Sequence, residues 1–555
     1  LQPVTSIHLH SNYFDEIEAN SNVATIYIFS ITAFLILFIA CINYVNISLA
    51  LSNKRSKEIG VRKILGASKQ QVIFQFIIES FVHLSIAIVF SAALLQLGLP
   101  IFNQVTEKAL TLANNKYLIL LFPAIAALGL MSALYPALVL SKFNPILALK
   151  NTISAGALKT SSFRKALLIF QFSIAVVLLV CTGVVFLQLS FIRNKNLGFA
   201  KEQVVVLPLR SPDTQLQYPV LKQELLMNPN VLKVSASHSV PGDEINEGIY
   251  RSTSALGGNN DALDFVSNTL FVDEDYLDLM NIKVVAGRRF SKINRASDVS
   301  NAVIINQAAA KKLGWQSPEE AIGKTIEYFV SRQRGFLPAQ VVGVVSDFHY
   351  QSLRSAIEPL IVRLANEDSV PTNYLSTITN LSIKIRGTNV RQTIAELKNA
   401  WQKVNSSYPF EYTFLDDRLR KLYSSDEKLG QVFSKFSFIV LFITAIGLFG
   451  ISILTIEQRT KEIGVRKVLG ANVTEIVALL SKDFLKLVAF AVIIASPIAW
   501  YAMHEWLQSF AYRTNISWVV FAITALIAFG IASITIGFQA IKAAIANPVK
   551  SLRTE

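Results

Sequence analysis

The sequence predicts a polytopic α-helical membrane protein with one large mixed α/β domain outside the bilayer. The chain has 555 residues, of which 52% are apolar and only 16% charged, and this composition is too apolar for an ordinary soluble domain. The apolar residues gather into stretches of about 20, which is the length that crosses a hydrocarbon core of roughly 30 Å. A polar block at 193–432 separates the fourth stretch from the fifth, and it is long enough to hold a core of its own.

Seven apolar stretches are long enough to span a membrane. They fall at about 24–50, 72–99, 117–140, 166–192, 433–456, 473–500 and 517–539. Cys41 and Cys181 each lie within one of them, so a packing role is expected for both cysteines rather than a disulfide.

The distribution of the net charge of +14 indicates which ends of these stretches face the cytoplasm. Four connecting segments together carry 18 basic and four acidic residues, which accounts for the whole excess. The segments are 51–71, 141–165, 457–472 and 541–555. Such a bias marks the cytoplasmic side of a membrane protein. The charge therefore requires no nucleic-acid partner, and the 193–432 block is expected to be extracytoplasmic.

A repeated segment organises the chain. Residues 57–68 read KEIGVRKILGAS and residues 461–472 read KEIGVRKVLGAN, a match at ten of twelve positions, 404 residues apart. Each copy has one apolar stretch before it and two after it, and each unit closes with an Asn-Pro tail, NPILALK at 144–150 and NPVKSLR at 547–553. A repeat of this kind indicates two equivalent structural units.

The repeat defines the expected domains. They are a first unit at 23–150, a cytoplasmic linker and span at 151–192, the outer domain at 193–432 and a second unit at 433–555. Only the second unit is preceded by an additional span and an outer domain. By symmetry, we expect that a first span and a first outer domain precede this sequence, and that residues 1–22 are the end of that outer domain.

The outer block carries both strand and helix patterns. Runs rich in β-branched residues predict strands at 203–209, 283–290, 302–307 and 339–349. Helical periodicity predicts helices at 215–227, 274–280 and 390–404.

Catalytic motifs are weak in this sequence. Gly323–Thr325 resembles the end of a phosphate-binding loop, but Pro318 stands where that loop needs glycine, so a turn is the better interpretation. Ser239 and Ser346 lack the glycines of a nucleophile elbow. A membrane-anchored enzyme is therefore the weakest of the function classes.

His8 and His10 form an HLH pair that would share one face of a strand, as metal ligands do. Exposed polar residues at the end of an outer domain explain the pair equally well, and metal binding is the less favoured of the two interpretations.

Ionisable residues inside the apolar stretches are costly. Glu79 and Asp483 are again 404 residues apart and lie near the cytoplasmic start of their stretches. Side chains at this depth reach the membrane surface, so a polar helix base is the favoured interpretation. The alternative is that both acids form contacts that help to transmit motion. The near absence of ionisable residues deeper in the stretches argues against an ion-coupled carrier.

As a helix, the repeated segment is amphipathic. Glu58 and Arg62 are spaced to form an i,i+4 pair, and Ile59, Arg62 and Lys63 share one side. The other side is apolar and consists of Val61, Ile64 and Leu65. Gly66 is placed to end the helix. Anchoring at the membrane surface needs charge and amphipathicity, but it does not need the same sequence twice. Two near-identical helices suit a partner with two equivalent sites, such as a symmetric dimer.

These residues carry a family resemblance. KEIGVRKVLGA after EQRT at 457–460, the Asn-Pro tails, VVGVVSDFH at 341–349 and FLDDRLRKLYSSDEKLG at 414–430 resemble FtsX-like/MacB-type ABC transporter permeases, in the eight-span form with two outer domains. The resemblance covers about 1–553. It implies a permease without a nucleotide site of its own, and an outer domain of the MacB periplasmic core type. It also implies a bacterial cytoplasmic membrane location.

The resemblance further implies that the two copies dock on a separate dimeric cytoplasmic ABC ATPase, which binds the ATP and Mg. The implied docking residues are Lys57, Glu58, Ile59, Gly60, Val61, Arg62, Lys63, Gly66, Lys461, Glu462, Ile463, Gly464, Val465, Arg466, Lys467 and Gly470. The expected function is non-catalytic: the chain couples ATP hydrolysis to export of a peptide, a lipid-linked molecule or a drug. The alternative is a signalling subunit that regulates an envelope hydrolase or a sensor kinase. Envelope partners fit either function.

Overall fold

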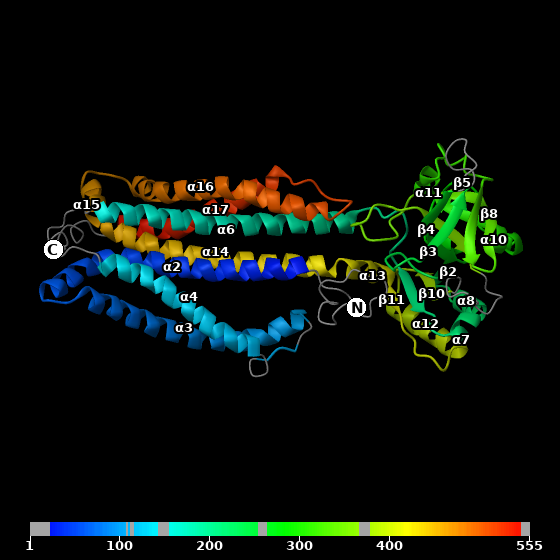
Figure 1. Ribbon diagram of the computed structural model, residues 1–555, viewed down its shortest axis with the longest axis horizontal. Coiled ribbons are helices and arrows are strands. Elements are labelled where there is room, and N and C mark those ends of the chain that lie inside the picture. The colour runs from blue at the N-terminus through cyan, green and yellow to red at the C-terminus, as the bar shows by residue number, and fades with distance from the viewer. Residues whose placement is uncertain are drawn as a thin grey trace. The chain divides into compact units, whose positions relative to one another are not determined.

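In a computed structural model (Figure 1), the described residues are 23–106, 109–111, 116–141, 155–252, 263–365 and 378–545. They form two compact units. Unit 1 comprises Leu1–Phe186, Leu429–Glu505 and Asn515–Glu555, and unit 2 comprises Leu187–Lys428 and Trp506–Thr514. Unit 2 thus begins six residues before the expected outer domain and ends four residues earlier, and it includes a short segment from the loop between the last two long helices.

Long helices make up unit 1. Those that belong to it wholly or in part are α2 (Val23–Ile64), α3 (Lys69–Thr106), α4 (Lys116–Ser141), α6 (Ala155–Asn194), α14 (Ser424–Gln458), α15 (Thr460–Val468), α16 (Val473–Gln508) and α17 (Trp518–Ile545). Proline occurs inside two of them, as Pro100 in α3 and Pro497 in α16.

Five helical segments among the described residues are long and apolar enough to cross a membrane. They are Phe29–Leu49, Lys69–Gln104, Ser162–Asn194, Ser424–Gln458 and Trp518–Ile545. The other two expected spans, 117–140 and 473–500, fall on α4 and α16, which are helical but are not among these five. A multi-pass membrane protein is confirmed, and the count of seven spans stays a prediction.

Polar contacts tie the helices of unit 1 together, and one of them joins the two repeats. Asn43 Nδ2 of α2 donates to the Ile443 carbonyl of α14 at 2.7 Å. Ser173 Oγ of α6 donates to the Ala491 carbonyl of α16 at 3.3 Å. Such bonds satisfy polar groups where lipid offers no partner.

Unit 2 contains the mixed α/β domain. Its strands are β1 (Val204–Pro208), β2 (Val231–Ser237), β3 (Glu247–Ser252), β4 (Leu263–Val272), β5 (Val284–Gly287), β6 (Ala302–Asn306), β7 (Thr325–Ser331), β8 (Gly335–Val345), β9 (Leu360–Leu364), β10 (Asn380–Ile385) and β11 (Thr413–Phe414). Its helices are α7 (Pro212–Leu216), α8 (Tyr218–Leu226), α9 (Tyr276–Leu279), α10 (Arg295–Asn301), α11 (Gln307–Lys312), α12 (Val390–Val404) and α13 (Leu415–Leu422).

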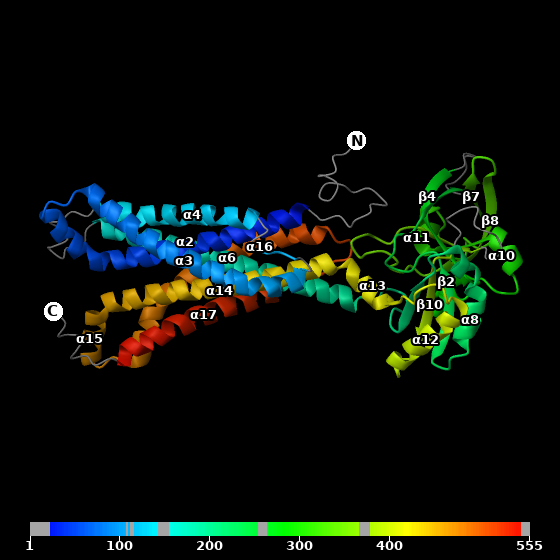
Figure 2. The same ribbon diagram turned by 90° about the horizontal axis from the view of Figure 1, so that it is seen from below.

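The strands form one sheet in the order β11-β1-β10-β2-β4-β3-β7-β8-β6-β9, and β5 pairs with β8. A parallel pairing of β4 with β9 joins the last strand back to the middle of this order. Six strands therefore close into a ring, and the other strands of the path extend from it as an open sheet. Helices α8 and α12 pack on the open part (Figure 2), where Leu221, Leu397 and Trp401 are buried in a common apolar core.

The described residues contain all four expected strands and two of the three expected helices of the outer block, and the helix expected at 274–280 is the shorter α9. The four expected strands correspond to β1, β5, β6 and β8, and the helix expected at 390–404 is α12. The helix expected at 215–227 is two helices that are interrupted at Gln217, because Pro219 has no amide hydrogen to donate to the Gln215 carbonyl in a continuous helix. Gly323 lies in a turn before β7 with φ +82°, a conformation that favours glycine, in agreement with the turn interpretation of Gly323–Thr325.

Candidate functional site

The first repeated segment forms the end of α2, which is one continuous helix of 42 residues. A glycine turn stops it. Gly66 has φ +97°, the Gly66 amide donates to the Lys63 carbonyl at 3.1 Å, and the Ala67 amide donates to the Arg62 carbonyl at 3.0 Å. This pair of bonds is a Schellman motif, which satisfies carbonyls that a helix end leaves free.

A capped helix start follows at once. The Ser68 amide donates to Gln71 Oε1 at 2.8 Å and the Gln71 amide donates to Ser68 Oγ at 3.3 Å, which is the reciprocal pattern of a capping box. Helix α3 then begins at Lys69. The segment is therefore a helix end and a helix start joined by a turn whose backbone is fixed by its own hydrogen bonds.

The second segment has the same geometry 404 residues later. Gly470 has φ +92°, its amide donates to the Lys467 carbonyl at 3.1 Å, and the Ala471 amide donates to the Arg466 carbonyl at 3.0 Å. The Asn472 amide donates to Glu475 Oε2 at 3.2 Å, and α16 begins at Val473. One difference is that α15 is separate from α14, since the helix is interrupted at Arg459.

Each segment carries one ion pair on its surface. Arg62 Nη2 lies 2.8 Å from Glu58 Oε1, and Arg466 Nη2 lies 2.9 Å from Glu462 Oε1. All four side chains are about half exposed, so each pair adds only about 0.3–0.5 kcal/mol to helix stability. Their positions are nevertheless fixed in the same way in both repeats.

One side of each segment is buried in its own repeat. Ile59 packs with Val72, Phe76 and Ala137, and Ile463 packs in a cluster with Ile476, Leu480 and Ala540. The second set stands at the repeat-equivalent positions of the first. Gly60 and Gly464 are also buried, and Lys467 Nζ donates to the Ala544 carbonyl at the end of α17 at 2.7 Å. Buried Ile59 and Ile463 therefore seat the two segments in the same way.

The opposite side of each segment is apolar and exposed. Leu65 is 81% exposed and Leu469 is 80% exposed, and Val61, Ile64, Val465 and Val468 are exposed beside them. We call these two sets, Val61–Ile64–Leu65 and Val465–Val468–Leu469, the exposed triads. A large apolar side chain exposed beside paired charges is typical of the centre of a protein interface.

The two acids expected to be equivalent lie beside these segments in different settings. Asp483 Oδ2 lies 3.2 Å from Arg459 Nη2, at the break between α14 and α15. Glu79 lines a cavity of about 340 Å³ together with Ile59, Arg62 and Gln75, and Arg62 Nη1 donates to Gln75 Oε1 at 2.8 Å. Both acids thus lie close to the repeated segments, and their expected roles, a polar helix base or contacts that transmit motion, stay predictions.

A second polar centre, which the sequence did not indicate, lies in unit 2. Arg354 Nη2 lies 2.6 Å from Oδ1 of the buried Asp426 near the start of α14. The Arg354 guanidinium also stacks on the Phe510 ring, 4.3 Å from its centroid. Gln188 at the end of α6 donates to the Tyr512 carbonyl at 3.1 Å and accepts from the Thr514 amide at 2.8 Å. We call these residues the helix-end junction.

The helix-end junction is closed by backbone and ring contacts. The Ala511 amide donates to the Arg354 carbonyl at 3.0 Å and the Tyr512 amide donates to the Leu353 carbonyl at 3.1 Å. The Tyr512 ring meets the His349 ring edge-on at 4.5 Å between centroids. Burial lowers the pKa of His349, and the nearby Lys195 lowers it further, so the imidazole is neutral at pH 7. The junction therefore joins the outer domain to segments from three long helices.

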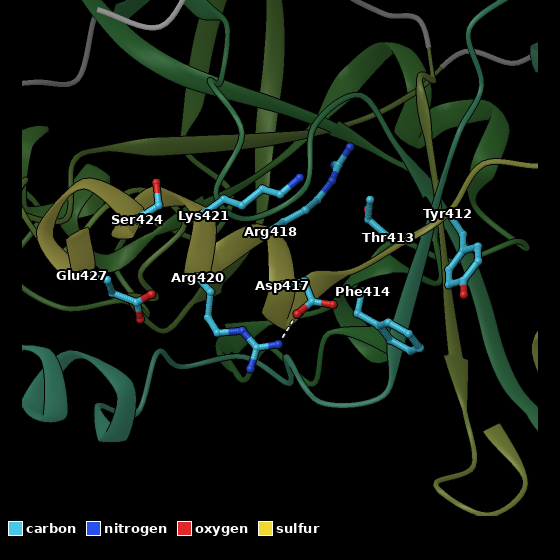
Figure 3. Close-up of a pocket in the computed structure, with 9 residues that line it drawn as sticks. All are labelled: Tyr412, Thr413, Phe414, Asp417, Arg418, Arg420, Lys421, Ser424 and Glu427. Carbon is cyan, nitrogen blue, oxygen red and sulfur yellow. Dashed lines mark hydrogen bonds and ion pairs between the residues drawn. The ribbon is translucent and has the colours of Figure 1, made fainter. Parts of the chain in front are cut away.

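A pocket of about 600 Å³ lies beside this junction in unit 2. Figure 3 shows Arg420 and Asp417 as a pair on one side, while Arg418 and Lys421 extend to the other. Arg418 Nη1 lies 3.1 Å from Asp243 Oδ2. Burial raises the pKa of Asp243, although Arg418 opposes this effect. Because Arg418 and Arg420 are paired within unit 2, the pocket has the character of a structural recess at the start of α14.

Some predicted site residues lie outside the described part of the chain. These are His8, His10, both Asn-Pro tails, and the side chains of Lys57 and Lys461. Within the described residues, no group of three or more His, Cys, Asp or Glu side chains is arranged to hold a metal ion. Ser239 is buried and donates to the Glu244 carbonyl at 3.0 Å, which is a structural role.

Two family profiles match the chain. The profile for the FtsX-like permease C-terminal region matches 30–145 and 434–548, so each match contains one repeated segment. The profile for the MacB-like periplasmic core domain matches 172–400. This chain belongs to the FtsX-like/MacB-type family of ABC transporter permeases. The mixed α/β domain of this permease is thus its MacB-like periplasmic core.

Relatives of this permease support the same family. It is 28% identical over 251 residues to the macrolide export ATP-binding/permease protein MacB of Aggregatibacter actinomycetemcomitans, covering 43% of this chain and 36% of that protein. It is 22% identical over 382 residues to the ABC transporter permease YknZ of Bacillus subtilis (strain 168), covering 64% of this chain and 90% of that protein. The chain therefore spans little more than a third of the length of the first relative, and its match to MacB is to the permease part alone.

Among solved structures, the periplasmic region of MacB from Actinobacillus actinomycetemcomitans aligns with 41% of this chain and 97% of that chain. The alignment has 15% identity and a TM-score of 0.29.

Proposed function

We propose that this permease is the membrane subunit through which a separate, dimeric cytoplasmic ABC ATPase drives export. The ATPase binds the ATP and Mg, and this chain performs no catalysis of its own. The observation that carries the proposal is the pair of repeated segments, which keep the same glycine turn, the same ion pair and the same exposed triad. The proposed location is a bacterial cytoplasmic membrane, with the periplasmic core on the far side from the ATPase.

The symmetry of the segments supports a two-fold partner. Each segment is seated by a buried isoleucine, Ile59 or Ile463, and each presents an exposed leucine, Leu65 or Leu469. Membrane anchoring needs apolar and basic residues in an approximate arrangement. It does not need a Schellman turn with the same two hydrogen bonds in both copies. A partner with two equivalent sites explains why both segments keep the same turn, because each site then binds the same surface.

Helix continuity supports mechanical coupling. Helix α2 runs without interruption from Val23 to Ile64, a length of about 63 Å at 1.5 Å per residue, which is about twice a hydrocarbon core of roughly 30 Å. Helix α14 runs from Ser424 to Gln458 as one helix. It carries Asp426 of the helix-end junction near one end, and α15 follows its other end. A movement imposed on the first repeated segment therefore has one continuous helix along which to travel, whereas the second segment adjoins α14 at the break at Arg459.

The proposed substrate class is an amphipathic molecule such as a peptide, a lipid-linked molecule or a drug. MacB relatives are described as macrolide exporters, and a drug of that kind is one member of this class. The alternative is a signalling subunit that uses the same motion to regulate an envelope hydrolase or a sensor kinase. A substrate-dependent rise in ATPase activity in reconstituted vesicles favours export, whereas activation of an envelope enzyme without substrate favours signalling.

The docking role is tested with the exposed triads. A tagged full-length chain is purified from its native membrane, and co-purifying P-loop ATPases are identified by mass spectrometry. Substituting Leu65→Asp together with Leu469→Asp is expected to reduce ATPase recovery at least tenfold while the protein still inserts. The matched control is Ile293→Asp, which changes a side chain of the outer domain that is 95% exposed. Equal ATPase recovery from the double variant and the control contradicts the docking role.

A further inference from the structure

A cavity of about 330 Å³ lies among α2, α3 and α4 in the first repeat. The three helices lie side by side in both views (Figures 1 and 2). The volume is at the lower end of the range for small-molecule sites, about 300–1,000 Å³. Most of the wall is apolar, and it includes Leu37, Leu84 and Ile125. The wall also contains a group of polar side chains that can form hydrogen bonds.

Tyr44, Ser80 and His83 form that polar group. The Tyr44 hydroxyl lies 2.5 Å from Ser80 Oγ. Only one of the two hydroxyls donates in this bond, so the other keeps a hydrogen that is free to donate to a further acceptor. His83 lines the same cavity one helical turn beyond Ser80. The His83 ring makes no hydrogen bond to another residue in the part of the chain that the structure describes.

The cavity is bounded by a close helix contact. A Cβ added at Gly129 of α4 would lie 2.7 Å from Leu84 Cδ1 of α3, so the two helices touch directly at this wall. Packed helices therefore close the cavity on this side. The cavity is not simply a gap between three helices that are spread apart. Its shape depends on the small residue at position 129.

The second repeat shows that the polar group is not needed for the packing. The repeat-equivalent positions of Tyr44, Ser80 and His83 are occupied by Leu448, Phe484 and Leu487. The second repeat forms the corresponding helices α14, α16 and α17 with these apolar side chains. An ionisable residue within a membrane span is costly and has a functional role by default. The polar group of the first repeat therefore has a role other than holding the helices together.

We propose that this cavity binds a single-chain amphiphile whose head group accepts hydrogen bonds from His83 and from the Tyr44–Ser80 pair. A water-sized group takes about 10–15 Å³ on this measure, so a cavity of about 330 Å³ holds roughly 22–33 such groups, which is room for one medium-length chain and its head group. His83 lies 14 residues after the start of α3, about 21 Å along the helix, so the head group is held at membrane depth. The occupant is a free amphiphile, because the head group of a bilayer lipid lies outside the hydrocarbon core.

Photolabelling of the full-length protein in lipid nanodiscs tests this site. The probe is dodecanoic acid with a diazirine in its chain, and a second probe is a phospholipid with the same chain. Labelling is expected on the peptides of α2, α3 and α4 that line the cavity, and excess unlabelled dodecanoic acid is expected to compete. Labelling by the free acid is the expected result, and labelling by the phospholipid alone contradicts the proposal.

The decisive variant combines Tyr44→Leu, Ser80→Phe and His83→Leu, because the second repeat already packs with these residues. It is expected to reduce cavity labelling at least tenfold. The matched control, Phe81→Leu with Val82→Leu, alters exposed neighbours on the same helix and is expected to keep full labelling. His83→Gln retains a donor and is expected to keep most labelling, which separates loss of the site from loss of the fold.

Unchanged labelling in the triple variant overturns the proposal, as does equal labelling by a diazirine dodecane that lacks the head group. No ATP and no ATPase are present in this experiment. Its failure is therefore distinct from failure of the docking role proposed above.

Discussion

Asn43 and Gly447 occupy equivalent positions of the two repeats and lie against each other where α2 meets α14. They are 404 residues apart, and a Cβ added at Gly447 would lie 1.9 Å from Asn43 Oδ1. A second glycine of α14 makes a neighbouring contact, since a Cβ added at Gly450 would lie 3.3 Å from Ile47 of α2. At the Asn43–Gly447 contact, the two helices therefore pair through equivalent positions that carry a large residue in one repeat and glycine in the other.

This relationship predicts that Gly447→Ala destabilises the protein by about 1–3 kcal/mol, because an added methyl group in a packed contact forces neighbouring atoms apart. The cost is expected to be smaller in an Asn43→Ala background, where the clash is removed. The melting temperature in detergent measures both effects. Gly530→Ala is the control, since nothing lies within 4 Å of its added Cβ. An equal loss in both backgrounds contradicts the contact.

At the helix-end junction, Arg354→Ala is expected to destabilise unit 2 locally by about 1–3 kcal/mol. The substitution leaves the buried Asp426 carboxylate without its ion-pair partner, and the cost lies below that of a fully buried pair because the Arg354 side chain is partly exposed. Hydrogen exchange of 506–514 measures the loss as faster exchange. Arg210→Ala, in an exposed pair with Glu411, is the control and is expected to change exchange little. Unaltered hydrogen exchange of 506–514 in Arg354→Ala would contradict a stabilising role of the Arg354–Asp426 ion pair.

The junction is also expected to weaken in acid. The folded pKa of His349 lies below its ordinary value through burial and the nearby Lys195, so the unfolded state binds a proton first as pH falls. The contribution of neutral His349 is therefore fully present above about pH 6.5 and is lost as pH falls toward the folded pKa. The protection of 349–354 from hydrogen exchange, corrected for the slower intrinsic exchange in acid, is expected to fall below that pH. His349→Phe keeps an aromatic ring against Tyr512 and is expected to remove the pH dependence; the same dependence in that variant excludes His349 as its source.

Charge reversal of both repeated segments is expected to abolish ATPase recovery without preventing insertion. Arg62→Glu with Arg466→Glu breaks two exposed ion pairs, each of which stabilises its helix by only a few tenths of a kcal/mol. Co-purification from native membranes measures the effect. Reversal of two exposed arginines on the β7–β8 hairpin, Arg332→Glu with Arg334→Glu, is the control. ATPase recovery that matches this control counts against a docking surface at Arg62 and Arg466.

The repeated segments could be predicted in detail because their geometry is local. The i,i+4 spacing of Glu58 and Arg62 and the glycine at 66 predict an ion-paired helix that ends in a turn, and the structure contains both features. The sequence grouped Ile59 with Arg62 and Lys63 on one side. The burial of Ile59 depends on Val72, Phe76 and Ala137, which lie on the two following helices, so a single-helix pattern does not reveal it.

The outer domain and its junction were less predictable because their contacts are long-range. The β4–β9 pair joins Asn268–Val272 to Leu360–Leu364, and no local pattern specifies that partner. Likewise, nothing in the sequence of 506–514 indicates that Gln188 binds it. The cavity of the first repeat depends on the packing of three helices, although the contrast between His83 and Leu487 was a signal available in the repeat.

Binding of Gln188 to Tyr512 and Thr514 places a constraint on biosynthesis. The last strand and α13 of the outer domain are translated by residue 422, but the segment that completes unit 2 ends at Thr514. Ribosomes add about 5–20 residues per second, so the 92 intervening residues take roughly 5–18 s. During that interval Gln188 and Arg354 lack their partners in 506–514, and the membrane-insertion machinery must deliver that loop across the bilayer before the domain is finished.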